Sequence, residues 1–263
     1  MFYPSIKKSY KKILCIFTLN NLFLNLALDI GNSLIKAGVF KNNVLIKSFI
    51  INEKSFSDFR KTIEQKNIKN SIASNVSNNN PEIIKLLSNE TNFIKFDKNL
   101  NLPFKNKYKS KDKLGQDRIA LITNASISFP NQNILVIDVG TCITYDFLDE
   151  ENKYLGGNIS PGLEMRYKSL KNQTANLPLL RYYKPDYLIG DNTDNSIHSG
   201  VFNGIVGEIN SFISMYKLKF GKIKIILTGG NSKLLLNKIK NTIFADSNFL
   251  LFGLNHLIEL NKK

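Results

Sequence analysis

The stretch "LALDIGNSLIKAGVF", Leu26–Phe40, places an aspartate, a glycine and an asparagine in the middle of an otherwise apolar run. The apolar segments on either side have the length and composition of core β-strands. Glycine lets the backbone turn sharply and leaves the neighbouring N–H groups unobstructed. We therefore expect a strand, a tight turn that carries Asp29 and Gly31, and a second strand.

A second copy of this pattern, "LVIDVGTCITYDF", begins at Leu135 and carries Asp138 ahead of Gly140 and Thr141. The two copies are separated by the length of an ordinary domain, which indicates internal duplication of an α/β unit. A third glycine turn, at 228–230, follows a further apolar run and is expected to lead into a helix. The sequence therefore predicts an α/β protein with two similar domains.

The first two of these turns each offer a carboxylate, Asp29 or Asp138, at the end of a buried strand and next to open backbone N–H groups. Such a site suits a phosphate that is bound together with its cation. Because a carboxylate alone would repel a phosphate, a bridging cation such as Mg²⁺ is expected. A single Asp-x-Gly turn is more often purely structural, but the set of turns favours a nucleotide cleft between two domains.

The chain has 263 residues, 43% of them hydrophobic, and a net charge of +15. Its basic residues are scattered and form no RNA-binding or zinc motif, so nucleic-acid binding is a minor alternative to attraction of anionic metabolites. Cys15 and Cys142 fit neither a disulfide framework nor a metal site, which favours a reducing cytoplasm. Because only His198 and His256 offer an imidazole, carboxylates are expected to carry the acid–base chemistry.

Near the N-terminus, four lysines precede an apolar segment in "KKSYKKILCIFTLNNLF", residues 7–23. This resembles a signal sequence only superficially, because asparagines interrupt it and no small-residue cleavage site follows. We interpret residues 1–23 as an extension of doubtful role, with a membrane-associated leader as the alternative. No later segment is apolar over the length that a bilayer requires, so no membrane partner is expected.

The first domain is expected over residues 24–129 and the second over residues 130–263. Apolar runs and turn residues predict strands at 25–31, 33–40, 44–51, 69–77, 133–140, 141–148, 153–162 and near 223–228. Helices are expected at 55–67, from Pro81, before Pro130 and from Leu163.

The duplicated turns resemble those of the superfamily of acetate and sugar kinases, heat-shock chaperone ATPases and actin, whose halves resemble ribonuclease H. Within it, residues 26–260 resemble the type III pantothenate kinases. The motifs that carry this resemblance are "DIGNSLIK" at 29–36, "YKSKDKLGQDR" at 108–118, "DVGTCITYD" at 138–146, "GGNISPGLEMR" at 156–166, "SLKNQTANLP" at 169–178, "IGDNTDNSIHSGVFNGIVGEI" at 189–209 and "TGG" at 228–230. The resemblance implies two ribonuclease H-like domains, each a mixed β-sheet flanked by helices, with the active site in the cleft between them.

The resemblance also implies an activity, the transfer of the γ-phosphate of ATP to pantothenate in the first step of coenzyme A biosynthesis. It further implies Mg²⁺ with ATP, a monovalent cation (K⁺ or NH₄⁺), a cytoplasmic location and a homodimer whose active site is completed across the interface. Two rivals stay open. One is another phosphotransferase or a phosphatase of the same superfamily, and the other is a non-catalytic nucleotide-binding regulator.

By resemblance, Asp117 is the proton acceptor of the reaction. The substrate-binding residues that the resemblance implies are Tyr108, Gly115, Gln116, Asp117, Arg118 and Thr193. Each has a plainer alternative: Asp117 as an aspartate that stabilises a helix N-terminus, Arg118 as a structural ion pair, and Thr193 as a helix N-cap. Thr193 is implied to reach the pantothenate site of the neighbouring subunit.

By the same resemblance, Asp138 holds the monovalent cation, with a structural turn former as the alternative. The implied ATP-binding residues are Asp29, Ile30, Gly31, Asn32, Ser33, Leu34, Ile35, Lys36 and Thr141, with Asp29 near magnesium. Lys111, Gln116 and Cys142 depart from the Pro, Ala and Ala that the family usually has. None removes a charge that the chemistry needs, so we expect them to affect substrate affinity more than activity.

Overall fold

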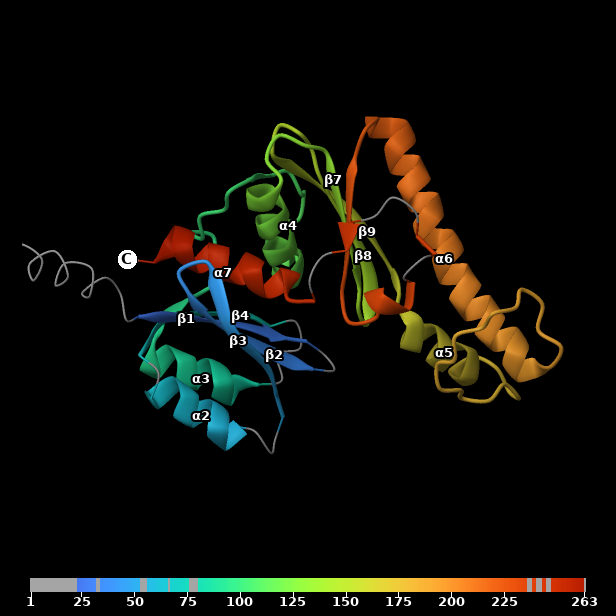
Figure 1. The fold of residues 1–263 in the computed structure, drawn as a ribbon, viewed down its shortest axis with the longest axis horizontal. Helices are drawn as coiled ribbons and strands as arrows, with labels where there is room; N and C mark the ends of the chain where they lie inside the picture. The colour runs from blue at the N-terminus through green and yellow to red at the C-terminus, as the bar shows by residue number, and fades with distance from the viewer. Residues whose placement is uncertain are drawn as a thin grey trace, which may run out of the picture.

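A computed structural model of the chain describes residues 23–31, 34–52, 56–65, 67–75, 80–235, 238–239, 243–244 and 247–262. Two β-sheets form its frame, and two helices lie between them (Figure 1). The predicted extension at residues 1–23 lies outside the described residues except for Phe23.

The first sheet has the strand order β3-β2-β1-β4-β5. Its strands are β1 (Leu24–Ile30), β2 (Ile35–Lys41), β3 (Val44–Ile51), β4 (Ile68–Asn75) and β5 (Asn92–Ile94). β1, β2 and β3 form the predicted antiparallel meander, and β4 and β5 add parallel strands beside β1. Asn42 takes a positive φ of 52° in the turn between β2 and β3, a conformation that asparagine tolerates.

The second sheet has the order β11-β10-β7-β8-β9-β6 and repeats this design. Its strands are β6 (Lys105–Asn106), β7 (Ile134–Val139), β8 (Cys142–Leu148), β9 (Lys153–Pro161), β10 (Lys224–Thr228) and β11 (Ile243–Phe244). β7, β8 and β9 form an antiparallel meander, and β10 lies parallel to β7 as β4 lies parallel to β1. The prediction of two similar α/β units with mixed sheets is confirmed.

The helices form layers around and between the sheets (Figure 1). They are α2 (Phe56–Gln65), α3 (Pro81–Glu90), α4 (Gln116–Ser128), α5 (Leu163–Asn172), α6 (Thr193–Phe220) and α7 (Phe249–Asn261). α2 and α3 cover the outer face of the first sheet, and α5 and α6 cover the outer face of the second. α4 and α7 fill the space between the two sheets, where α4 contributes buried side chains to the cores on both sides.

The crossing of α4 and α7 is close because α7 carries a glycine at the contact. A Cβ atom on Gly253 would lie 1.8 Å from the carbonyl oxygen of Ala120. Such a contact with backbone cannot be relieved by a side-chain rotation, so a larger residue would force the helices apart. This packing fixes α4, whose first turn carries Asp117, between the two sheets.

Two elements cross the predicted domain boundary at residues 129 and 130. β6, from the first half of the sequence, pairs with β9 of the second sheet, while α7, from the second half, packs on β1. β6 and α7 each pack on the unit that the other half of the sequence forms, so packing as well as the chain joins the two units. The domain boundary at residues 129 and 130 therefore stays a prediction.

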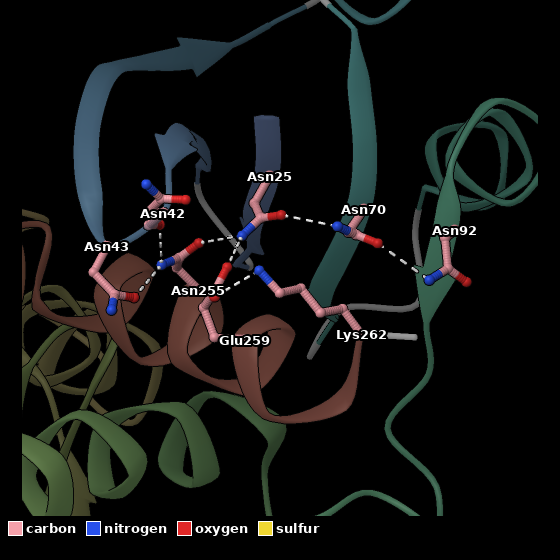
Figure 2. Close-up of polar contacts among 8 residues, drawn as sticks. All are labelled: Asn25, Asn42, Asn43, Asn70, Asn92, Asn255, Glu259 and Lys262. Atoms are coloured by element: carbon pink, nitrogen blue, oxygen red, sulfur yellow. Dashed lines mark hydrogen bonds and ion pairs between the residues drawn. The ribbon is translucent and has the colours of Figure 1, made fainter. Parts of the chain in front are cut away.

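A network of asparagines fixes α7 to the first sheet (Figure 2). Asn255, which is completely buried, accepts a hydrogen bond from Asn25 on β1 and donates to the carbonyl oxygen of Asn42. The chain of amides continues across the sheet from Asn25 to Asn70 on β4 and to Asn92 on β5. Because each buried amide has a partner, the network satisfies the polar groups that this contact buries.

The sequence predicted a helix after the third glycine turn, and the predicted type of this helix is wrong. Residues Ser232–Leu235 form a short 3-10 helix instead of an α-helix. The backbone N and the hydroxyl of Ser232 both donate to the carbonyl oxygen of Gly229, at 3.2 and 2.7 Å. These bonds close the tighter i to i+3 turn that defines a 3-10 helix.

Candidate active site

Asp29 and Asp138 occupy equivalent positions near the ends of β1 and β7. Asp29 lies opposite Ser74 on the parallel strand β4, and Asp138 lies opposite Thr228 on β10. The carboxyl ends of strands in open α/β sheets are where such folds bind ligands. The duplication therefore brings one carboxylate from each half of the chain to a ligand-binding edge.

The carboxyl group of Asp29 is partly buried and is held by its neighbour on β4. Ser74 donates a hydrogen bond of 2.9 Å from its hydroxyl to Asp29 Oδ1. Burial raises the pKa of Asp29 to about 6, against the opposing effect of Ser74, and repulsion by Asp117 adds to the rise. Asp29 and Asp117 are therefore close enough to repel each other.

The pKa of Asp138 is raised further than that of Asp29. Burial raises its pKa to about 7, and the charges of Asp117 and Asp29 add to the effect. The turn after β10 approaches this carboxyl closely, since a Cβ atom on Gly229 would lie 2.2 Å from Asp138 Oδ1. Gly229 has a φ of +96°, which also favours glycine. The third glycine turn thus shapes the surroundings of Asp138, and the three carboxylates act on one another.

Asp117 lies in the first turn of α4, where the helix dipole favours a negative charge. Its Oδ1 accepts a hydrogen bond of 2.8 Å from the backbone N of Arg118. Burial nevertheless raises the pKa of Asp117 above its usual range. A Cβ atom at position 115 would lie 2.4 Å from the same oxygen. Gly115 therefore leaves the space that the Asp117 carboxylate occupies.

Arg118 is buried beside Asp117 and forms an ion pair with Asp146 on β8. Its Nε and Nη2 lie 2.8 and 2.7 Å from Asp146 Oδ1, and Asp146 is completely buried. Burial alone would lower the pKa of the guanidinium, but Asp146 outweighs it and raises the pKa, so Arg118 stays charged. The structural ion pair that the sequence offered as the alternative role of Arg118 is therefore present.

Two tyrosines complete the surroundings of this ion pair. The Tyr154 hydroxyl donates to Asp146 Oδ1 at 2.7 Å, and the Tyr108 ring stacks on Tyr154 with 6.1 Å between centroids. The guanidinium of Arg118 lies 5.6 Å from the centre of the Tyr108 ring. The structure thus places Tyr108 against Arg118, the residue that follows Asp117 in α4.

The family of the chain follows from comparison with known proteins. A family model described as type III pantothenate kinase matches residues 25–215. The chain belongs to the type III pantothenate kinase family. A type III pantothenate kinase from Christiangramia forsetii is 46% identical over 241 residues, which are 91% of this chain and 99% of the relative. One from Bacteroides fragilis is 35% identical and covers 90% of this chain and 98% of its own length.

Solved structures are similar over most of the chain. A conserved Campylobacter jejuni protein assigned as a Baf family transcriptional activator is 26% identical, has a TM-score of 0.60, and is matched over 90% of this chain and 98% of its own. A ROK family glucokinase from Streptomyces griseus, in complex with glucose and AMPPNP, is only 11% identical but has a TM-score of 0.53 over 89% of this chain and 98% of its own. The second likeness concerns the fold alone, and it agrees with the predicted α/β fold of two similar units in this pantothenate kinase family member.

The first glycine turn is closed by a hydrogen bond of 3.0 Å from the backbone N of Gly31 to the carbonyl oxygen of Leu34. Asn32 and Ser33, two of the expected nucleotide contacts, lie outside the described residues. Ile30 packs in the core of the first unit, whereas Leu34 is 47% exposed. Within this turn, therefore, a nucleotide would meet backbone and the Leu34 side chain instead of Ile30.

Lys36 and Thr141 flank the two turns. The ammonium of Lys36 donates a hydrogen bond of 2.6 Å to the carbonyl oxygen of Ser247, just before α7, and its charge lowers the pKa of Asp29 against the larger effect of burial. Ile35, beside it, begins β2. Thr141 is exposed between β7 and β8, and its carbonyl oxygen accepts a hydrogen bond from Gly162 N at 3.1 Å.

Thr193 is the first residue of α6, and the cap of that helix is Asn192. The Asn192 side chain accepts a hydrogen bond of 2.9 Å from the backbone N of Asn195, so the alternative interpretation of Thr193 as the N-cap is wrong by one residue. Thr193 lines a cavity of about 690 Å³ together with Arg166 and residues of α5 and α6.

His198, on the same helix, is buried and bonds through Nδ1 to the Tyr167 hydroxyl at 2.8 Å, so it serves packing.

Among the described residues, no cluster of three or more His, Cys, Asp or Glu side chains is arranged to hold a metal ion by itself. A kinase does not require one, since Mg²⁺ keeps several waters and binds through one or two carboxylates plus substrate phosphates. Carboxylate oxygens are ligands that hard cations prefer, and a cation near Asp29 and Asp138 would offset the repulsion that these carboxylates experience. These carboxylates therefore fit a hard cation.

Among the residues that the structure describes, no helix combines the length and hydropathy needed to cross a membrane.

Proposed function

We propose that this chain transfers the γ-phosphate of ATP to the primary hydroxyl of pantothenate, with Asp117 as the general base. The observation that carries this proposal is the position of Asp117, on the first turn of α4 and within electrostatic reach of both Asp29 and Asp138. A base is most effective when its pKa lies near the working pH, and burial moves the pKa of Asp117 in that direction. Asp117 would orient the hydroxyl and take its proton as the new P–O bond forms.

The nucleotide would bind along the two duplicated turns. The backbone N–H groups near Gly31 and Thr141 would contact the phosphates, and Asn32, Ser33 and Lys36 complete the proposed ATP site. Asp29 would hold Mg²⁺, which neutralises charge on the transferring phosphoryl group. The phosphates would then lie between carboxylates that repel one another in the ligand-free protein, and this repulsion supports a need for cations in the cleft.

A monovalent cation, K⁺ or NH₄⁺, is proposed at Asp138. In the part of the chain that the structure describes, no ion pair reaches this carboxylate, and its charged neighbours with the largest effects are Asp117 and Asp29. A cation there would lower the free energy of the charged cleft. The oxygen donors of a carboxylate and of neighbouring backbone suit such an ion.

Pantothenate is proposed to bind beside Tyr108 and Arg118. The tyrosine offers a hydroxyl and an apolar face, and the guanidinium is suited to a carboxylate. Asp146 and Tyr154 would hold Arg118 in place for this contact. Asp146 lies within the motif at 138–146, where a carboxylate inside an apolar strand signals a buried partner.

A homodimer in which Thr193 completes the pantothenate site of the partner is also proposed. Apolar side chains that a monomer leaves exposed on β9 and α6 support it, among them Ile159, Met215 and Leu218, which are 61%, 51% and 90% exposed. Symmetric self-association is the commonest way to cover such a face. A cytoplasmic location completes the proposal, on the ground of the cysteine usage.

The proposal is tested with Asp117→Asn in the full-length protein, assayed with ATP, Mg²⁺ and a panel of alcohol acceptors that includes pantothenate. Turnover should fall by roughly two to four orders of magnitude, the usual contribution of general acid–base catalysis. Asp112→Asn is the matched control, because Asp112 is exposed in the 3-10 helix just before α4. Turnover near the wild-type value in Asp117→Asn would remove Asp117 as the base, and activity only on another acceptor would favour a different phosphotransferase. ATP binding without any turnover in the wild-type protein would favour a non-catalytic regulator.

A further inference from the structure

Gln116, the first residue of α4, connects this helix to the end of β4 in the first sheet. Its Oε1 accepts a hydrogen bond of 2.8 Å from the backbone N of Asn75, the last residue of β4. β4 pairs with β5 only as far as Ile72. The last residues of β4 therefore extend beyond that neighbour, and the N–H of Asn75 is available to a side-chain acceptor.

The hydrogen bond between Asn75 and Gln116 joins the neighbours of two carboxylates, Asp29 and Asp117. Ser74, the residue before Asn75, donates its hydroxyl proton to Asp29 at 2.9 Å. Gln116 directly precedes Asp117. A short path of two hydrogen bonds and two peptide linkages therefore runs from the Asp29 carboxylate through the end of β4 to Asp117.

The start of α4 lacks the usual means of fixing a helix end. Its N-cap is Gly115, which has no side chain to bond the first backbone N–H groups. Repulsion between Asp117 and Asp29, which contributes to the raised pKa of Asp29, acts to separate the helix start from the strand end. The Gln116 amide opposes that separation, because it is anchored on backbone instead of on a mobile side chain.

We propose that Gln116 is a positioning residue that holds the start of α4, and with it the Asp117 carboxylate, against the strand end that carries Asp29. The inference rests on the proposed function, since it takes Asp117 as the base. Gln116 touches neither substrate nor reacting atoms in this account. It acts through the distance between two carboxylates that the reaction needs, whereas the resemblance implied that Gln116 contacts the substrate.

The test compares Gln116→Met, which keeps the side-chain length and removes the acceptor, with Gln116→Glu, which keeps an acceptor oxygen. Gln116→Met should lower kcat about tenfold, less than the roughly hundredfold that a misplacement of about 1 Å can cause. The KM values for ATP and pantothenate should stay within about twofold, since the phosphate turns and Tyr108 are untouched. Gln116→Glu should recover part of the lost kcat, because it restores the acceptor for Asn75 N but adds a negative charge beside Asp117 and Asp29. Gln132→Met, at an exposed position before β7, is the matched control.

A double-mutant cycle with Asp117→Asn decides whether Gln116 acts through the base. If it does, adding Gln116→Met to Asp117→Asn should leave the residual kcat unchanged, because the group that Gln116 positions has already been lost. A tenfold loss in both backgrounds would overturn the proposal, as would a lower Tm with unchanged kcat. Failure of the proposed function is separate, because Asp117→Asn alone reports it.

Discussion

Gly115→Ala should impair catalysis far more than folding. The added Cβ would lie 2.4 Å from Asp117 Oδ1, whereas ordinary contacts begin at 3.4 Å, so the carboxylate oxygen must retreat by about 1 Å. It can do so by rotating its side chain, which leaves the backbone of α4 in place. Gly115 has φ −56° and ψ 135°, a conformation that alanine also adopts. The substitution therefore moves the proposed base with little other disturbance.

The expected magnitudes follow from this geometry. A displacement of about 1 Å at a reacting group can lower the rate about a hundredfold. Replacing glycine by alanine at an N-cap costs on the order of 1 kcal/mol or less, which corresponds to a fall in Tm of a few degrees. We expect kcat to fall about a hundredfold with nearly unchanged KM for ATP, because Asp29 and the phosphate turns are not touched.

Steady-state kinetics and thermal unfolding of the purified variant provide the measurement. Gly207→Ala is the matched control, because no atom lies within 4 Å of the Cβ that it adds on α6, and its kcat should equal that of the wild type. A folded Gly115→Ala protein with kcat within about twofold of the wild type would refute the assignment of Asp117 as a base held in this position.

Three further outcomes are expected. In denaturant unfolding, Asp138→Asn should raise the free energy of unfolding of the ligand-free protein by roughly 2–4 kcal/mol at pH 8 and by less at pH 5. The reason is that the pKa of the Asp138 carboxyl is raised to about 7 in the folded protein, so its charge destabilises the fold increasingly as the pH rises from about 4 to 7. Initial rates at fixed ionic strength should be high in potassium or ammonium chloride and low in sodium chloride, and Asp138→Ala should be slow in all three salts; equal wild-type rates would remove the proposed ion. Asn255→Ala should lower the free energy of unfolding by roughly 2–3 kcal/mol, since it removes the buried hydrogen bonds that Asn255 makes to Asn25 on β1 and to the carbonyl oxygen of Asn42 in the β2–β3 turn (Figure 2).

The sequence predicted those parts of the fold that depend on local pattern. Alternation and apolar runs placed the strands of both meanders, and the repeated Asp-x-Gly turns indicated the duplication. Asp29 and Asp138 were recognised as candidate site residues because the Asp-x-Gly turn occurs twice, whereas a single copy is more often purely structural. Pro81, at the first turn of α3, marked the start of that helix.

The features that the sequence did not predict depend on contacts between distant segments. Asp146 is recognisable as the partner of Arg118 only once β8 and α4 are packed together. The bond from Asn75 to Gln116 likewise joins residues that are far apart in the chain. The cap of α6 was misplaced for a local reason, since Asn192 and Thr193 are both competent caps and composition does not choose between neighbours.

The arrangement of the carboxylates relates the stability of the fold to its proposed activity. Asp29, Asp117 and Asp138 come from three elements, and each has a pKa raised by burial, so their charges destabilise the ligand-free protein near neutral pH. The elements stay together because α4 and α7 are packed between both sheets and α7 is bonded to β1 through buried amides. Cations that arrive with a nucleotide would favour the charged carboxylates, so part of the binding free energy would come from relief of this repulsion. Binding of Mg²⁺ and ATP should therefore raise Tm more at pH 8 than at pH 5, where Asp29 and Asp138 are largely protonated in the free protein.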